Sequence, residues 1–141
     1  MTIVVDTNCL LAAVPKKSQY RWLYDAILNE QVRLVVTTEI ITEYEEQLEL
    51  FYAPDYAEFI LIALLNIPSL VRINPLSFYW LLIANDPDDN KFVDAAIAAN
   101  AAYIITNDSH YRLLKDIPFP SVNCARLADF KPILDDFLSN Q

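Results

Sequence analysis

Four acidic residues stand at positions where a folded chain of this pattern would bring side chains together. Asp6 ends the apolar run TIVVD, and Asp108 ends a second run, YIITND. Asp89 opens the alanine-rich segment before that second run, and Glu43 lies in a periodic segment between them. Carboxylates that lie close together raise one another's pKa unless a cation is shared between them. Oxygen ligands of this kind suit Mg²⁺ or Mn²⁺, and such an ion activates water and stabilises charge on a phosphodiester.

The hydrophobic pattern predicts the elements that would position these acids. Short β-branched runs predict strands, and apolar residues at helical spacing predict helices. The predicted strands cover residues 2–6, 32–38, 70–74, 103–108 and 121–125. The predicted helices cover 18–30, two segments that start at 38 and 54, one that starts at 89, a turn or two in 109–116, and 128–140; a short helix at 77–84 is ambiguous. Because strands alternate with helices, the chain is expected to form an α/β fold, a three-layer α/β/α sandwich with a central, mainly parallel sheet.

Such a sheet gathers the acids at one edge. Ligands of parallel α/β sheets bind outside the carboxyl ends of the strands, where Asp6 and Asp108 are predicted to lie if their strands are neighbours. Glu43 comes about one and a half turns into the helix that follows the strand at 32–38. Asp89 begins the helix that leads into the strand of Asp108. Both can reach the same edge, so the sequence predicts a metal site there.

The composition is that of a folded protein. The chain has 141 residues, of which 55% are hydrophobic, and we expect one domain spanning residues 1–141. No apolar run reaches the roughly 18 residues of a membrane span, and the start, MTIVVD, lacks the basic segment of a signal peptide. Cys9 and Cys124 are far apart in sequence and belong to no CxxC pair. Free thiols and a cytoplasmic location are therefore expected.

The chain contains no glycine. This excludes the glycine-dependent phosphate loops of nucleotide-binding proteins. Backbone positions with positive φ must then fall to residues that tolerate them, and Asn100 and Asn107 are the candidates.

The net charge of −9, with an isoelectric point near 4.4, argues at first against a nucleic-acid partner. Two bound divalent ions would bring the formal charge to about −5, which weakens that objection. The basic residues Lys16, Lys17, Arg21 and Lys91 are scattered along the sequence. Phosphate contacts and a solvated surface are both open to them.

Several segments together resemble a known family. VVDTNCLL, TTEIITEY, DPDDNKFVDAAIAANAAYIITND and RLADFKPIL are similar to the PIN-domain proteins, in particular to the short bacterial and archaeal toxins of toxin–antitoxin pairs. The resemblance covers nearly the whole chain and depends on the ordered set of motifs. It implies an α/β/α sandwich, a metal-dependent endoribonuclease that hydrolyses RNA, frequent homodimers, and inhibition by a small antitoxin protein.

The resemblance also assigns roles to individual residues. The four acids of the family, which hold one or two Mg²⁺ (or Mn²⁺) ions, correspond in order to Asp6, Glu43, Asp89 and Asp108. Asn8 and Thr106 match polar positions that support the acids, and Asp86 matches an acid just ahead of the third one. Asn107 stands where relatives often carry glycine. Asparagine can adopt the same backbone conformation, but its amide could alter access to the metal.

Other interpretations stay open at this stage. Glu43 has acidic neighbours on its helix, so a solvated helix face is the alternative to a site, and Asp89 could act only as a helix N-cap. His110 and Cys9 could act as a base or a nucleophile, although no signature supports either role. The apolar segments 59–67 and 78–84 could serve a dimer, an antitoxin groove or the core.

Two functions compete with the nuclease. A catalytically inactive PIN-like module would use the same fold to bind a protein partner. A phospho-acceptor signalling domain also gathers acids at strand ends, but it usually needs an acid pair after its first strand and a lysine near its last strand, which are missing here.

Overall fold

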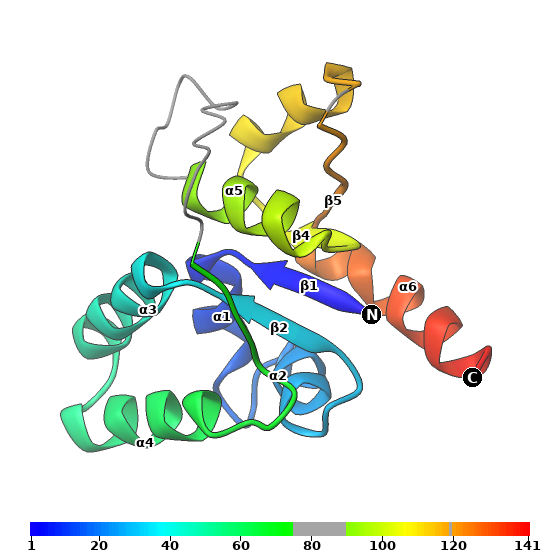
Figure 1. The fold of residues 1–141 in the computed structure, drawn as a ribbon. Helices are drawn as coiled ribbons and strands as arrows, with labels where there is room; N and C mark the ends of the chain where they lie inside the picture. Colours follow the sequence, from blue (N-terminus) through cyan, green and yellow to red (C-terminus); the bar gives the residue numbers. More distant parts are fainter. Residues whose placement is uncertain (75–89, 119) are drawn as a thin grey trace.

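The computed structural model describes residues 1–74, 90–118 and 120–141 (Figure 1). The ambiguous segment at 77–84 and two of the acids singled out by sequence, Asp86 and Asp89, lie outside the described residues. No helix in the described part of the chain is long and apolar enough to span a membrane.

Parallel strands form the central sheet of the described residues, in the order β3-β2-β1-β4-β5. The strands are β1 (Thr2–Val5), β2 (Arg33–Val36), β3 (Val71–Arg72), β4 (Tyr103–Ile105) and β5 (Cys124–Ala125). β1 is central: Ile3 pairs with Leu34 of β2 on one side and with Tyr103 of β4 on the other. Ile3, Val4 and Val5 are fully buried, as expected for a strand that is covered on both faces.

Helices cover both faces of this sheet (Figure 1). They are α1 (Thr7–Ala13), α2 (Arg21–Leu28), α3 (Thr38–Phe51), α4 (Pro54–Leu65), α5 (Asn90–Ala99), the 3₁₀ helix η2 (Ser109–Asp116) and α6 (Leu127–Ser139). α5 packs against β1, β2 and β4. Trp22 of α2 stacks on Phe130 of α6, which also contacts Tyr103 of β4. The predicted three-layer α/β/α sandwich with a mainly parallel sheet is confirmed.

Two features of the fold differ from the sequence analysis. The helix α1, which directly follows β1, was not predicted, because seven residues are too few to show a helical period. β3 and β5 have two residues each, fewer than predicted, since they lie at the edges of the sheet and pair on one side only. The consequence of α1 is that Asp6 stands between a strand and a helix.

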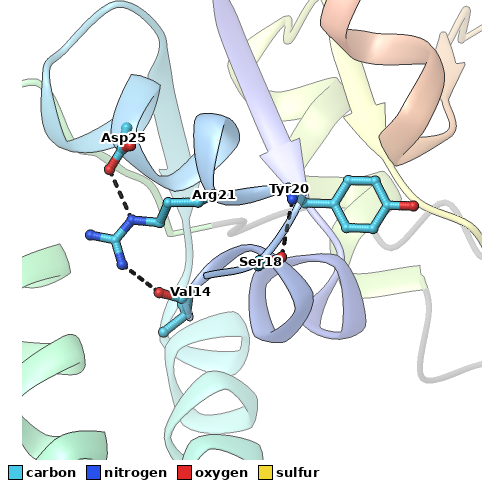
Figure 2. A network of polar contacts seen from close by, with 5 residues as sticks. All are labelled: Val14, Ser18, Tyr20, Arg21 and Asp25. Carbon is cyan, nitrogen blue, oxygen red and sulfur yellow. Dashed lines mark hydrogen bonds and ion pairs between the residues drawn. The ribbon is translucent and has the colours of Figure 1, made fainter. Parts of the chain in front are cut away.

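Side chains hold the connection from α1 to α2 in place of glycine turns (Figure 2). The Ser18 hydroxyl donates to the carbonyl of Ala12 and accepts from the backbone N–H of Tyr20. The Arg21 guanidinium donates to the carbonyl of Val14 and pairs with Asp25 at 2.9 Å. These contacts fix the end of α1 that is remote from Asp6.

The positive-φ positions are partly as predicted. Asn100 has φ of 51° where α5 ends, as expected from its tolerance of left-handed backbone. The second such residue among those described is Glu30, with φ of 59° after α2, and its carboxylate accepts from the backbone N–H of Ser69. Asn107 was expected to have positive φ, and this prediction is wrong.

Candidate metal and catalytic site

Asp6 is a buried acid whose carboxylate is turned toward β4. Its backbone N–H donates to the carbonyl of Ile105 at 2.9 Å, which extends the pairing of β1 with β4 by one residue. Although Asp6 occupies the N-cap position of α1, its side chain makes no capping hydrogen bond. Its carboxylate instead accepts from the Thr106 hydroxyl at 2.8 Å. The side chain is therefore held at the carboxyl ends of two neighbouring strands, as the sequence predicts.

Asp108 lies at the same edge and is joined to Asp6 through Thr106. The Thr106 hydroxyl that donates to Asp6 accepts from the backbone N–H of Asp108 at 3.1 Å. One oxygen of Asp108 accepts from the backbone N–H of His110 at 2.9 Å and so caps η2. The Nδ1 atom of His110 lies 3.3 Å from the same oxygen. The second oxygen is not needed for capping, so capping and metal binding are compatible.

Glu43 differs from the other acids of α3. Its carboxylate accepts from the Thr7 hydroxyl and forms an ion pair with Lys91 of α5 at 2.8 Å. The Glu43 side chain is 28% exposed and that of Lys91 is 14% exposed. Its acidic neighbours on the helix are exposed: Glu39, Glu45 and Glu46. Glu43 is therefore half-buried and held by two partners, unlike its exposed neighbours on the helix.

The three acids interact electrostatically. The pKa of Asp6 is raised, first because burial disfavours the charged form and then because Glu43 and Asp108 repel it. Hydrogen bonds from the Thr106 hydroxyl and the backbone N–H of Thr7 act in the opposite direction and do not cancel the rise. Carboxylates from three remote parts of the sequence thus lie within reach of one another's charge.

The carboxylates of the described residues suit a hard divalent cation, but they do not supply its complete set of ligands. Within residues 1–74, 90–118 and 120–141, no three His, Cys, Asp or Glu side chains are close enough to bind one metal ion. Mg²⁺ typically uses one or two carboxylates and keeps several waters, so Asp6 and Asp108 meet its needs. Glu43 is directed toward Lys91, and Asp89 lies outside the described residues.

Sequence reasoning missed three polar residues around these acids. Thr7 and Lys91 hold the two oxygens of Glu43, and the buried Tyr44 hydroxyl donates to the carbonyl of Val5 at 2.5 Å. Burial is the main reason why the pKa of Tyr44 is raised well above its ordinary value. Thr7 could have been found, because it directly follows Asp6. The pairing of Lys91 with a glutamate 48 positions earlier in the chain had no signal in the sequence.

Three of the residues discussed as neighbours of the acids lie within the described part of the chain, and they make different contacts. The prediction for Thr106 agrees with its hydrogen bond to Asp6. Asn8 lies in the first turn of α1 with an exposed side chain, which makes none of the described hydrogen bonds. Asn107, in place of the glycine of relatives, uses its Oδ1 atom to accept from the backbone N–H of Leu127 and so caps α6. Asparagine at this position therefore has a structural role of its own.

Cys9 is unsuited to nucleophilic chemistry. Burial, with the nearby charge of Asp6, raises the pKa of its thiol to about 12. A thiol with this pKa stays protonated near neutral pH, and the thiolate is the reactive form. Cys124 is half-buried, and burial raises its pKa to about 11. The thiol alternative left open by the sequence thus loses support.

Comparison with known proteins agrees with the fold. Residues 2–110 match the family model of the PIN domain, whereas no curated protein sequence matches the chain. One similar solved structure is VapBC2 from Rickettsia felis bound to a DNA fragment from their promoter, at 16% identity and a TM-score of 0.63, covering 89% of this chain and 98% of that one. Another is FitAB bound to an IR36 DNA fragment, at 14% identity and a TM-score of 0.55, covering 89% of this chain and 94% of that one. On the match over residues 2–110, the protein belongs to the PIN-domain family.

Proposed function

We propose that this PIN-domain protein is a Mg²⁺- or Mn²⁺-dependent endoribonuclease and the toxin of a toxin–antitoxin pair. PIN domains are generally nucleases, which sets the reaction class. The observation that carries the proposal is the burial of the Asp6 carboxylate at the strand ends, where Thr106 joins it to Asp108, and the pKa of Asp6 is raised accordingly. Burying a charge in this way costs free energy, and a shared cation would offset that cost.

The residues would divide the work of phosphodiester hydrolysis. Asp6 and Asp108 would hold the ion directly, and Glu43 with Asp89 would complete the set. A bound divalent ion supplies charge stabilisation at the reacting phosphate and activates water. Thr106 orients Asp6, and Thr7 orients Glu43, whose other oxygen is paired with Lys91. In the reaction, a P–O bond forms to water, the P–O ester bond breaks, and a proton reaches the leaving oxygen.

A direct test compares the wild type with Asp6→Asn and Asp108→Asn on a labelled RNA. We expect cleavage that needs Mg²⁺ or Mn²⁺, stops with EDTA, and is lost in both variants. Mn²⁺ binding, measured by calorimetry, should weaken in both variants as well. Equal cleavage by the wild type and Asp6→Asn would refute the proposal, since the activity would then come from a contaminant or another site.

The second candidate is a catalytically inactive PIN-like module, and one observation favours it. Lys91 already neutralises Glu43, and among the described residues no three ligands converge on one point. In that case the wild type should neither bind Mn²⁺ nor cleave RNA. Calorimetry therefore separates the two functions without depending on the choice of RNA.

An antitoxin partner has a plausible surface on α3 and α4, which pack side by side (Figure 1). A pocket between them is lined by Ala57, Leu61 and three glutamates, Glu45, Glu49 and Glu58. Large apolar side chains near it are more than half exposed: Leu50, Phe51, Phe59 and Ile62. An apolar surface with acidic residues suits a segment that carries both apolar and basic side chains. A homodimer, which the family resemblance also implies, stays a prediction that light scattering can test.

A further inference from the structure

A second feature lies beside the acids, at the edge where β4 and β5 end. It is a pocket of about 270 Å³ between the loop after β4, η2, β5 and the start of α6. We call it the basic pocket. Its lining includes three cationic side chains, Arg112, Lys115 and Arg126, and two carboxylates, Asp108 and Asp129. The floor is apolar and contains Ile133 together with the buried Tyr111.

The charge of the basic pocket contrasts with that of the chain. Three of the ten Lys and Arg residues line it, although the net charge is −9. Arg112, Lys115 and Arg126 are exposed. Among the described residues, three other cations are paired with carboxylates: Arg21, Lys91 and Lys131. None of the three pocket cations forms an ion pair with any of the described residues, so their charge is available to a ligand.

The 3₁₀ geometry of η2 aligns two of these cations. Side chains three residues apart lie on the same face of a 3₁₀ helix, because it has 3.0 residues per turn. Arg112 and Lys115 have this spacing, with a rise of roughly 6 Å between them. Tyr111 and Leu114 have the same spacing on a neighbouring face of η2, which is buried. Two cations held in line at this distance can contact neighbouring phosphates of one strand.

The basic pocket is continuous with the candidate catalytic site. Thr106 and Asp108 line the pocket, and the Thr106 hydroxyl donates to Asp6. A strand whose reacting phosphate lies over Asp6 and Asp108 would therefore extend into the pocket. The three cations outnumber the two carboxylates of the lining, so the basic pocket favours a negatively charged ligand over a neutral one.

We propose that Arg112, Lys115 and Arg126 form a subsite for the RNA backbone, which binds the phosphates next to the bond that is cut. This inference rests on the proposed nuclease function. It adds where the substrate lies, which is on the side of the active site formed by η2, β5 and α6. It also explains how an acidic protein binds a polyanion. The carboxylates of the candidate catalytic site and the cations of the basic pocket lie next to each other at the carboxyl ends of the strands.

The test measures RNA binding apart from cleavage. A fluorescent single-stranded RNA is titrated, without divalent ions, into the Asp6→Asn protein and into the same protein with Arg112→Gln, Lys115→Gln and Arg126→Gln. The slope of log K against log salt should fall in magnitude by about 2, because a single strand contributes about 0.7 per neutralised phosphate. At about 0.1 M salt the affinity should drop roughly a hundredfold, and the difference should close near 1 M.

A matched control removes the same charge elsewhere. Lys16→Gln, Lys17→Gln and Arg33→Gln also remove three positive charges, and Arg33 begins β2, at the end of the strand remote from the acids. This variant should bind RNA with nearly the same slope as Asp6→Asn. All six side chains are exposed, and circular dichroism melts verify that both variants fold.

Three outcomes overturn the subsite. The pocket variant binds RNA like the control, or the Asp6→Asn protein binds no RNA, or the pocket variant keeps RNA binding and loses binding of poly-glutamate. The third outcome would identify an acidic peptide as the ligand. Cleavage by the wild type is assayed separately. Its absence would refute the nuclease, whereas a loss of RNA binding confined to the pocket variant would still support the subsite.

Discussion

Replacing Asp6 by asparagine keeps the size of the side chain and an acceptor for the Thr106 hydroxyl, but removes a buried negative charge. The hydrogen bond from Thr106 loses about 1 kcal/mol, the difference between bonds to charged and to neutral acceptors. The relief of burial and of repulsion by Glu43 and Asp108 is larger, because the pKa of Asp6 is raised in spite of its hydrogen bonds. We expect Asp6→Asn, without metal at pH 7, to increase the free energy of unfolding by about 1 kcal/mol, or roughly 3 °C in Tm.

The effect has a defined pH dependence. Below the ordinary aspartate pKa of 3.8, Asp6 is protonated in both the folded and the unfolded state. As pH rises from there, the unfolded state loses its proton first, so the wild type loses stability until the raised folded pKa is passed. The advantage of Asp6→Asn should therefore be complete above the raised pKa of folded Asp6 and vanish as pH falls below about 3.8.

Bound metal should reverse the order of stability of the wild type and Asp6→Asn. A ligand at about 100 times its Kd stabilises the state that binds it by about 2.7 kcal/mol. Mn²⁺ should thus stabilise the wild type above Asp6→Asn, whose binding is impaired. Urea denaturation followed by circular dichroism, with EDTA and then with Mn²⁺, measures both effects. The control is Glu58→Gln, an exposed neutralisation that should stay within about 0.5 kcal/mol of the wild type.

A clear result would refute this reasoning. If Asp6→Asn is less stable than the wild type without metal at pH 7, the Asp6 charge is favourable in the folded protein. The carboxylate would then be a structural residue, satisfied by Thr106 and the backbone, and the strongest support for a cation site would be lost.

Three substitutions and one labelling experiment probe the surroundings of the candidate site. Tyr44→Phe should cost about 1–2 kcal/mol in urea denaturation, because a β1 carbonyl loses its buried donor, and no loss would contradict that bond. Lys91→Gln should tighten Mn²⁺ binding about fivefold in calorimetry by releasing Glu43, and weaker binding would show that Lys91 positions it instead. Asn107→Ala should cost about 1 kcal/mol in urea denaturation through the lost α6 cap, which an unchanged midpoint would exclude. Cys9 should react with iodoacetamide at pH 8 only in urea, since its pKa is about 12, and fast labelling of the native protein would refute its burial.

The fold was predictable because its strongest signals are local. The β-branched run before Asp6 forms the central strand, and its burial on both faces follows from that position. The alternation of strands and helices then determined the layers. Short elements gave no such signal: α1 has seven residues, and β3 has two. Their formation depends on packing against the rest of the sheet.

The positions of the candidate site residues were predictable only as far as strand ends determine them. Asp6 and Asp108 lie where the ends of neighbouring parallel strands place them. Glu43 was distinguished from the other glutamates of α3 by resemblance alone, and the contacts that set it apart come from Thr7 and Lys91. Contacts of this kind depend on how a helix packs over a sheet, which a single sequence does not reveal.

The distribution of charge constrains how a partner could inhibit the proposed nuclease. Acids and exposed apolar side chains are concentrated on α3 and α4, whereas the basic pocket is formed by η2, β5 and α6. A basic partner that covers α3 and α4 would therefore leave Arg112 and Lys115 free to bind RNA. Inhibition of cleavage then requires the partner to reach Glu43, the one acid of the site that α3 carries. A partner that blocks cleavage without lowering RNA affinity would agree with this arrangement, and one that displaces RNA outright would contradict it.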